Sequence, residues 1–389
     1  IGFDINCGVR LIRTNLELGN ATPKIKSWID RRYRDVPSGL GTKGPVQLSA
    51  NEVRQVLEHG AQWAVRSGYG SPADLECTED GGKMEAADSS TVSSRALERG
   101  MPQLGTMGSG NHFVEIQVVE EVLALDVAKV FELHENQIVI MIHTGSRGLG
   151  HQVCTDYLAT MNSALKKYGM TVPDRQLACA PFQSPEGQRY YAAMACAANF
   201  AWANRQCITH WVRQATAREF GSSPESLGMT LLYDVCHNIA KIEEHSVDGR
   251  SRKLCVHRKG ATRAFPPGHS DVPAAYRRVG QPVIVPGDMG RNSYVLVGTQ
   301  IAMEISFGST CHGAGRLMSR NEALSAKSPG DVRQSLAEAG VYARSASKRA
   351  LAEEAPEAYK DVNDIVDITH KAGISMKVVR LRPLGVVKG

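Results

Sequence analysis

Short apolar runs separated by glycine-rich turns dominate the hydrophobic pattern of the chain. Their length is typical of β-strands, and none approaches the ~18 uncharged apolar residues of a membrane span. We therefore expect a soluble protein with no membrane segment. Strands are predicted at the following runs: Gln137 to Ile142, Met229 to Val235, Pro282 to Val285, Ser293 to Val297 and Val378 to Leu381.

Helices are predicted between some of these strands. Ser49 and Glu52 have the spacing of a capping box, and a second helix is expected after Gly150. Strands and helices alternate without a regular βαβ rhythm, which favours the α+β class over a doubly wound sheet. We predict a single large mixed domain over residues 1–389, with central β-sheets flanked by helices. The inward-facing positions are Val53, Val56, Leu57, Ala61 and Ala64 in the first helix, and Val153, Tyr157, Leu158 and Met161 in the second.

Two segments stand apart from this pattern. The stretch from Cys77 to Gly100 is polar, and we expect it to form an excursion at the surface. The chain opens on the strand-like residues Ile1, Gly2 and Phe3, so we expect an upstream segment of a longer natural protein. No stretch has the composition of a linker that would divide the chain.

The amino-acid composition of the chain limits the kind of protein that it can be and the environment in which it works. With 389 residues, 42% of them hydrophobic, the chain can bury a large core without disulfides. Its nine cysteines form no C-x-x-C pair, which predicts a reducing, cytoplasmic environment. The net charge of +5 is too small to demonstrate a polyanionic partner. A local cluster without acids either holds phosphates or is a solvated loop: Arg250, Arg252, Lys253, Arg258, Lys259 and Arg263.

Several common catalytic motifs are absent from the sequence. There is no Walker-type G-x-x-x-x-G-K-[ST], no H-E-x-x-H, no G-x-S-x-G and no G-x-G-x-x-G between a strand and a helix. The Lys-x-Asp-Gly motif of other nucleotidyl-transferring ligases is also missing. Any nucleotidyl transfer would need a nucleophile other than that lysine.

Histidines occur where predicted strands end. The apolar run before His143 and the run before His237 both lead into turns, and Arg147 follows the first of them. Asp4 and Cys7 are spaced so that both can reach one cation if the backbone turns. A buried cysteine and satisfied core histidines are the alternative, but two histidines at strand ends favour a metal site. Arg147 offers a planar fork to phosphate oxygens.

Three glycine-rich turns carry further candidate chemistry. The loop from Gly105 to His112 offers free backbone N–H groups for phosphate, or is an ordinary flexible turn. The turn from Pro286 to Gly290 follows an apolar strand. His312 lies among small residues, with room for a bulky group to approach. It would ligate metal, act as a base or attack phosphorus, and the residues alone leave these open.

Together these blocks resemble the RtcB-type RNA-splicing ligases, a family that seals RNA ends with GTP and manganese. The resemblance covers nearly the whole chain in the family's order, and it predicts the fold of that family. The segment that usually precedes the first block in the family is absent here. The matching blocks are Gly2–Arg10, Gly110–Phe113, His143–Gly148, His237–Ala240, Cys311–Arg316, Leu381–Pro383 and Lys388–Gly389.

The resemblance implies a site with two metal ions. Asp4, Cys7 and His112 would hold one ion. Cys7, His143 and His237 would hold the other, with Cys7 as the bridge. The softness of these donors alone favours zinc or cobalt, so manganese rests on the family. The residues implied around the guanylate are Asn111, His112, Phe113, Val114, Glu115, His237, Asn238, Pro286, Gly287, Asp288, Met289, Ser293, His312, Gly313, Ala314, Gly315 and Lys388.

The resemblance also implies an activity. His312 would carry GMP covalently and pass it to an RNA 3′-phosphate, and a 5′-hydroxyl would then seal the strand. The substrates would be tRNA halves or broken RNA, with Arg147 on the RNA end and an archease-type activator as a further partner. Family members commonly have Thr or Ser where this chain has Asp288, whose charge would repel a triphosphate. The alternatives are a metal-dependent RNA phosphoesterase or cyclic phosphodiesterase, and a catalytically silent RNA-binding member.

Overall fold

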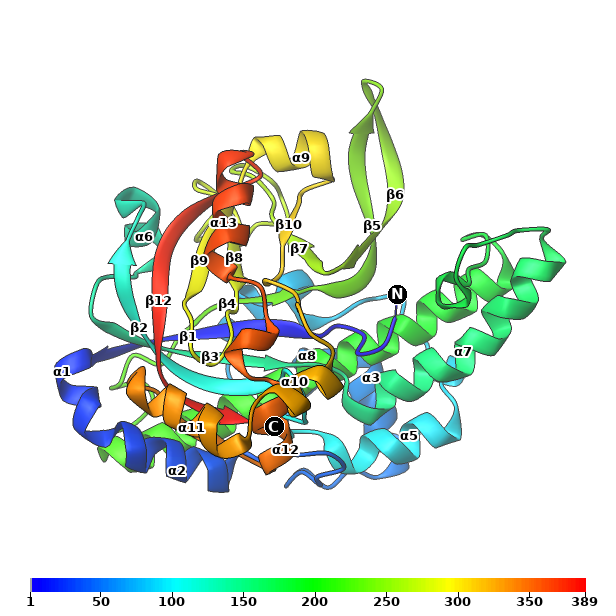
Figure 1. Ribbon diagram of the computed structural model, residues 1–389. Helices are drawn as coiled ribbons and strands as arrows, with labels where there is room; N and C mark the ends of the chain where they lie inside the picture. The colour runs from blue at the N-terminus through cyan, green and yellow to red at the C-terminus, as the bar shows by residue number, and fades with distance from the viewer. Residues whose placement is uncertain (1) are drawn as a thin grey trace.

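Eight strands form the central sheet, in the order β4-β1-β3-β2-β12-β9-β8, with β11 beside β12. The computed structural model describes residues 2–389. Among the sheet's pairs only β11 and β12 run parallel. The end strands β4 and β8 contact each other, so the sheet curls almost into a barrel (Figure 1). The strands are β1 Gly8–Glu17, β2 Phe113–Val122, β3 Gln137–Thr144, β4 Leu231–Cys236, β8 Pro282–Val285, β9 Ser293–Gly298, β11 Tyr342–Ser345 and β12 Ser375–Lys388.

Two small ribbons accompany this sheet. The first pairs β5 Asn238–Val247 with β6 Arg250–Lys259, and it stands away from the body at the top of Figure 1. The second pairs β7 Ala261–Arg263 with β10 Ser309–Cys311. Each of the five strands predicted from the apolar runs is present within one or two residues of its predicted bounds or inside a longer strand, so these five predictions are confirmed.

Helices cover the sheet on the side of α8 Pro185–Phe220, which packs against α3 Ala50–Arg66 and α7 Arg147–Lys167 (Figure 1). Small residues along α8, such as Ala197 and Ala201, are fully buried and allow this close approach. The shorter helices are α1 Leu18–Ala21, α2 Ile25–Asp35, α4 Pro72–Glu76, α5 Ser94–Gly100, α6 Leu125–Phe131, α9 Gln300–Ser306, α10 Arg320–Ala326, α11 Pro329–Glu338, α12 Lys348–Glu353 and α13 Val362–Lys371. The 3-10 turns are η1 Thr22–Lys24, η2 Glu79–Gly82, η3 Ser89–Thr91, η4 Met101–Gln103, η5 Arg175–Leu177 and η6 Pro356–Ala358.

The strand β3 is buried over its whole length because apolar cores cover both of its faces. Val139 and Met141 belong to one core, whereas Ile140 and Ile142 belong to the other. A strand covered on both faces has an uninterrupted apolar run, as the sequence has here. The mixed order of helices and mainly antiparallel strands confirms the predicted α+β class.

The capping box predicted at the start of α3 is present. The Ser49 hydroxyl accepts a bond from the Glu52 N–H at 3.2 Å, and the Glu52 carboxylate accepts one from the Ser49 N–H at 2.8 Å. The helix expected after Gly150 is also present, but α7 already begins at Arg147. No helix within residues 2–389 has the length and apolar character needed to cross a membrane.

Two expectations from the sequence are wrong. Gly2 and Phe3 lie outside any strand, while Ile1 lies outside the described residues. The segment Cys77–Gly100 is not a surface excursion, because Glu79 is 1% exposed and apolar side chains such as Met84 and Leu97 are buried. The polar residues of this segment find ionic partners inside the fold, which the local pattern cannot reveal.

Antiparallel pairing brings the ends of distant segments to one edge of the sheet. Gly8, at the start of β1, pairs with Thr144 at the end of β3 and with Cys236 at the end of β4. Phe113, at the start of β2, pairs with His143 and with Lys388 at the end of β12. Residues that flank these strand ends therefore meet, although they lie far apart in the sequence.

Candidate functional site

Five potential metal ligands gather at this edge of the sheet. Asp4 and Cys7 lie in the loop before β1, and His112 directly precedes β2. His143 belongs to the end of β3, and His237 lies between β4 and β5. Their donor atoms form two groups of three, each within 4.8 Å: Asp4, Cys7 and His112 in one, and Cys7, His143 and His237 in the other. Cys7 belongs to both groups.

The distances within the donor cluster are those of groups that face one point. His112 Nε2 lies 2.8 Å from Asp4 Oδ2 and 3.5 Å from Cys7 Sγ. His143 Nε2 lies 3.2 Å from Cys7 Sγ and 3.2 Å from His237 Nε2. All but Asp4 are buried.

The protonation of these side chains suits bound cations. His112 Nδ1 lies 3.1 Å from the Met107 carbonyl, which only accepts, so Nδ1 carries a proton and Nε2 is the ring atom directed at Asp4. Burial lowers the pKa of His143 and of His237 well below the usual range, which keeps both rings neutral. Acceptors that face acceptors repel each other unless a proton or a cation lies between them. The donor set therefore fits metal ions.

The loop that carries Asp4 and Cys7 is held by buried polar contacts. Asp4 and Asn6 have positive φ angles of 59° and 52°, a conformation that side chains rarely adopt. Arg205 on α8 donates to the Asn6 carbonyl at 2.8 Å and to its side-chain oxygen at 2.9 Å. The Asn238 side chain donates to the carbonyl of Asp4 at 2.8 Å. These bonds fix the ligand-bearing loop before any ion binds.

Glycines leave space for the two charged groups next to the cluster. A Cβ at Gly145 would lie 2.2 Å from Asp4 Oδ1, and one at Gly108, whose φ is +99°, would lie 1.9 Å from Arg147 Nη1. Arg147 donates from Nε to the Thr106 hydroxyl at 3.3 Å. Burial alone would raise the pKa of Asp4, but His112 and, more weakly, Arg147 lower it below its usual value. The Asp4 carboxyl is therefore ionised at neutral pH.

A cavity of about 190 Å³ adjoins the donor cluster and shares His143 with it. His312, in the loop after β10, forms part of its wall, and its ring centre lies 4.9 Å from that of His237. Burial lowers the pKa of His312, so its imidazole is neutral at pH 7 and has a free lone pair. The lining residues are Asn111, Phe113, His143, Pro286, Gly287, Asp288, His312, Gly313, Ala314, Gly315, Arg316, Arg320, Tyr359 and Lys388.

Two buried ionisable groups lie in this region. Burial raises the pKa of Glu115 to about 8, and burial lowers the pKa of Lys388. Gln117 donates from Nε2 to the Glu115 carboxyl and to the Ser293 hydroxyl. The Ser293 hydroxyl also accepts the N–H of Gly287 at 3.0 Å, which ties β9 to the turn that lines the cavity.

Comparison with known proteins gives a consistent result. A family model described as "tRNA-splicing ligase RtcB" matches residues 1–389. Relatives with this description in Thermococcus kodakarensis and Archaeoglobus fulgidus are both 56% identical over 389 residues, which is all of this chain and 81% of each relative. The relative in Pyrococcus abyssi is 57% identical over 384 residues, 99% of this chain and 42% of the relative.

The chain belongs to the RtcB family. The family resemblance inferred from the sequence motifs is thereby confirmed. The metal ligands that RtcB similarity implies all belong to the donor cluster.

Not all of the residues implied for guanylate binding line the cavity. Most of them line the cavity, whereas Val114 and Met289 are buried in apolar cores on either side of the sheet. Glu115 and Ser293 lie behind the lining, and Asn238 supports the Asp4 loop. The members that line the cavity are Asn111, Phe113, Pro286, Gly287, Asp288, His312, Gly313, Ala314, Gly315 and Lys388.

The sequence prediction missed three residues that line the cavity. Arg316 donates to the Glu354 carboxylate at 3.1 Å and to the Tyr359 hydroxyl at 3.0 Å. Arg320 also pairs with Glu354, at 3.3 Å. The two arginines follow His312 at intervals of four residues, and this regular basic spacing was the only signal in the sequence.

Asp288 is accommodated within its own turn. Its Oδ1 accepts the N–H groups of Gly290 and Arg291, both at 2.9 Å, and its Oδ2 pairs with the Arg291 guanidinium at 3.2 Å. Burial raises the pKa of Asp288. Both carboxylate oxygens are thus engaged inside the turn, which reduces the repulsion that the sequence predicted toward a triphosphate.

The basic cluster predicted after Gly249 is neither a single phosphate-binding surface nor a loop. It lies on β6 and β7, where Arg258 and Arg263 are buried at 1% exposure. Arg258 pairs with Glu243 at 2.6 Å, and Arg263 pairs with Asp80 at 3.0 Å. Only the remaining members are exposed: Arg250, Arg252, Lys253 and Lys259.

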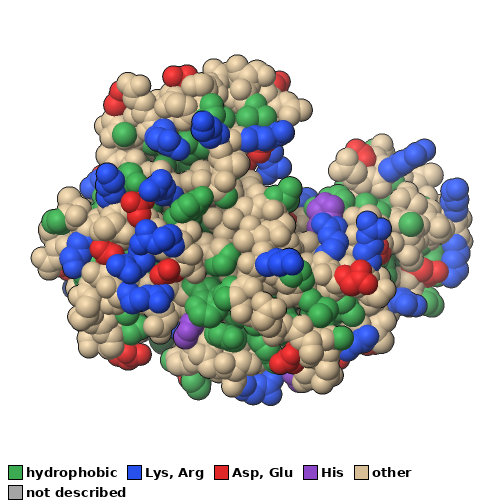
Figure 2. Space-filling model, turned by 90° about the horizontal axis from the view of Figure 1, so that it is seen from below, with side chains coloured by type: hydrophobic (Ala, Val, Ile, Leu, Met, Phe, Trp, Pro, Cys, Tyr) green, Lys and Arg blue, Asp and Glu red, His purple; other side chains and the backbone are tan. Residues whose placement is uncertain are grey.

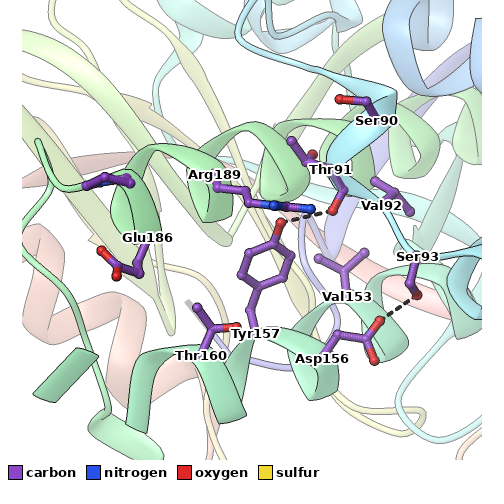
Figure 3. A pocket seen from close by; sticks show the side chains of 11 residues that line it. Ser90, Thr91, Val92, Ser93, Val153, Asp156, Tyr157, Thr160, Glu186 and Arg189 are labelled. Atoms are coloured by element: carbon purple, nitrogen blue, oxygen red, sulfur yellow. Dashed lines mark hydrogen bonds between the residues drawn. The ribbon is translucent and has the colours of Figure 1, made fainter. Parts of the chain in front are cut away.

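A wider hollow of about 530 Å³ lies elsewhere, between η3, α7 and α8 (Figure 3). Its polar groups bond to one another, with the Tyr157 hydroxyl donating to the Thr91 carbonyl at 2.9 Å and the Ser93 hydroxyl donating to Asp156 at 2.6 Å. None of the cluster's metal ligands lines it. On the face shown in Figure 2, Lys and Arg side chains stand among Asp and Glu rather than forming one basic field.

Proposed function

We propose that this protein is an RNA ligase that joins an RNA 3′-phosphate or 2′,3′-cyclic phosphate end to a 5′-hydroxyl end, with GTP as cosubstrate, in tRNA splicing or RNA repair. Membership of the RtcB family supports this activity. The observation that carries the proposal is the position of His312. Its neutral imidazole opens onto the cavity that also contains His143 of the donor cluster and Lys388.

The donor cluster would hold two metal ions. Asp4, Cys7 and His112 would hold one, and Cys7, His143 and His237 would hold the second. When bound, such ions neutralise negative charge that develops on phosphate oxygens. We propose manganese on the basis of the family, although thiolate and imidazole donors alone favour zinc or cobalt.

His312 would act as the nucleophile toward GTP. The lone pair of its ring nitrogen attacks the α-phosphorus, a P–N bond forms, and the bond to the bridging oxygen breaks to release pyrophosphate. Burial favours this step because it keeps the ring unprotonated. The proposed guanylate contacts are Asn111 to Glu115, His237, Asn238, Pro286 to Met289, Ser293, His312 to Gly315 and Lys388.

The guanylate would then be transferred from His312 to the RNA 3′-phosphate. An oxygen of the RNA 3′-phosphate attacks the phosphorus of guanylylated His312 and frees the histidine, after water has opened any cyclic phosphate. The 5′-hydroxyl of the second RNA attacks the activated 3′-phosphorus, GMP leaves, and the strand is sealed. Arg147 would hold the terminal phosphate through its guanidinium fork, next to Asp4. A cytoplasmic location and an archease-type activator remain predictions of the same proposal.

Covalent labelling tests this proposal. The protein is incubated with α-labelled GTP and Mn²⁺, and an acid-labile label is expected on the wild type but not on His312→Ala. The metal content should stay unchanged, because all five donors of the cluster remain in this variant. His257→Ala is the matched control, since His257 is an exposed histidine of β6 that does not line the cavity.

A second measurement separates a covalent carrier from a general base. His312→Ala should still join RNA whose 3′-phosphate already carries guanylate, because that substrate bypasses the missing nucleophile. A general base would be needed for the attack itself, and the pre-activated substrate would then restore nothing. Retained GMP labelling in His312→Ala would falsify the assignment. A metal-dependent phosphodiesterase would cleave cyclic ends but show no label in any variant.

A further inference from the structure

Two aromatic rings lie against each other at the surface beside the donor cluster. Phe3 directly precedes Asp4 and keeps 43% of its surface exposed. Its ring centre lies 4.5 Å from that of His151, an exposed residue of α7, at an interplanar angle of 32°. Exposed aromatic rings next to a phosphate-binding centre are the means by which many proteins hold the bases of single-stranded nucleic acid.

Two cations lie near this aromatic pair. Toward the cavity, Lys259 Nζ lies 3.2 Å from the position that a Cβ on Gly2 would take. The same lysine is close enough to His312 that its charge, after burial, contributes to the lowered pKa of that imidazole. Arg99 is near His151, whose pKa is lowered by burial and then by the charge of this arginine.

The aromatic pair also lies near the proposed clamp for the RNA end. Arg147 begins α7, and His151 follows four residues later on the same helix. This separation corresponds to about one helical turn, or roughly 6 Å along the axis. A terminal phosphate held by Arg147 would therefore leave its own nucleotide within reach of the exposed rings and of the two nearby cations.

We propose that the nucleobase of the 3′-terminal RNA nucleotide stacks on Phe3 and His151, with the neighbouring backbone phosphates beside Lys259 and Arg99. This inference rests on the proposed function and adds a subsite to it. Every base has an apolar face, so the aromatic pair holds the end without reading its sequence. It thereby orients the 3′-phosphate between Arg147 and His312, a positioning role that is separate from the chemical steps.

Fluorescence of a base analogue tests the stacking directly. RNA with 2-aminopurine as its 3′-terminal nucleotide should lose fluorescence on binding the wild-type protein. The loss should be absent with Phe3→Ala and restored with Phe3→Trp, because an indole also stacks. His151→Phe should retain the quenching and His151→Ala should weaken it. The matched control is Phe307→Ala, which removes another half-exposed phenyl ring at 45% exposure, from the C-terminal end of α9.

Joining kinetics with an abasic substrate separate stacking from a merely structural role. Phe3→Ala should raise the KM for RNA about tenfold, within the range of one lost base–aromatic stack. An abasic 3′-terminal nucleotide should cost the wild type a similar factor, and Phe3→Ala should then add nothing further. Metal content and GMP labelling of His312, neither of which needs RNA, are measured on the same samples.

Three outcomes would overturn the inference. Equal losses of Phe3→Ala on normal and abasic RNA would mean that Phe3 only supports the Asp4 loop. No loss on either substrate would assign the exposed rings to another partner, such as a protein. A penalty for an abasic nucleotide at the 5′-hydroxyl end alone would move the subsite to the other strand. If the wild type neither labels with GMP nor joins RNA, the proposed function has failed instead.

Discussion

Two buried polar clusters lie side by side, one on the strands β1 and β4 and the other at the ends of these strands. They differ in how the hydrogen-bonding capacity of their polar atoms is satisfied. In the ionic cluster, Arg10 donates to Asp234 at 2.7 Å, and Arg205 binds both oxygens of the same carboxylate at 2.8 Å. All three side chains are fully buried. Arg10 also donates to the Gln206 side-chain oxygen at 2.5 Å and to the Thr209 hydroxyl at 3.2 Å, so the polar groups of this cluster have hydrogen-bond partners within the protein.

In the donor cluster the polar atoms do not satisfy one another. His143 Nε2 faces His237 Nε2 at 3.2 Å, and the Nδ1 atoms of both rings are buried without a hydrogen-bond partner among the described residues. Two ring nitrogens that face each other in a buried site cost free energy that a cation bound between them can recover. The comparison shows that a buried cluster whose polar atoms are all hydrogen-bonded stabilises the fold. A buried cluster with unpaired polar atoms is instead suited to bind a ligand.

The satisfied cluster also positions the unsatisfied one. Arg205 donates to the carbonyl of Asn6, between Asp4 and Cys7, at 2.8 Å, and to the carbonyl of Thr144, next to His143, at 3.0 Å. One side chain therefore connects the ionic cluster to segments that carry ligands of both proposed ions. Variants of the two clusters should separate stability from metal binding.

The largest expected effect is on stability. Arg205→Met removes a partner of the buried Asp234 carboxylate, and the free energy of unfolding should fall by about 3–5 kcal/mol. Denaturation in urea measures it. The control is Arg218→Met on the same helix, because Arg218 pairs with Asp35 at the surface and its loss should cost less than about 1 kcal/mol. Equal losses in both variants would contradict the contrast between the clusters.

Cys7→Ser should act on metal binding instead. One thiolate is shared by both ligand groups, and its replacement hydroxyl is a poor bridging donor at neutral pH, so both metal affinities should fall by at least about 100-fold. Calorimetry and metal analysis measure the loss, and urea denaturation of the metal-free variant should change little. Cys154→Ser, a buried thiol of α7, is the control. Two equivalents still bound with unchanged affinity would make Cys7 structural.

Arg147→Ala tests the clamp between the donor cluster and the RNA. We expect GMP labelling of His312 to stay nearly intact, while strand sealing slows about 10- to 100-fold through the loss of a charge-assisted hydrogen bond to the terminal phosphate. Single-turnover assays of both steps provide the comparison. Arg95→Ala, an exposed arginine of α5, controls for a change in net charge. A similar loss in both steps would exclude this division of labour.

A change in the pH dependence of stability is expected for Glu115, a buried carboxyl with few partners. Burial raises its pKa from 4.5 to about 8, so the folded protein binds this proton more tightly than the unfolded chain does. The free energy of unfolding should therefore fall between pH 4.5 and 8, by up to about 1.4 kcal/mol per pH unit. Glu115→Gln should flatten this slope in urea titrations at several pH values. An unchanged slope would show that the carboxyl ionises freely in the fold.

The sequence by itself determined the local structure and the kinds of ligand. The uninterrupted apolar run of β3, the capping box of Ser49 and the turn after Pro286 depend on neighbours within a few residues. The placement of His143 and His237 at strand ends follows from the same local patterns. The family was also readable from these blocks because their order along the chain is itself sequence information.

Only the tertiary structure decided which charged side chains are exposed and which form buried ion pairs. Arg258 and Arg263 look like their exposed neighbour Arg252 in the sequence, but Glu243 and Asp80 neutralise them inside the fold. The polar segment Cys77–Gly100 was misread for the same reason, since Asp80 pairs with Arg263 and Glu79 pairs with Lys241. Likewise, Arg316, Arg320 and Tyr359 reach the cavity through a distant Glu354. The cost of a buried charge depends on partners that only the folded chain brings together, and a local pattern carries no record of them.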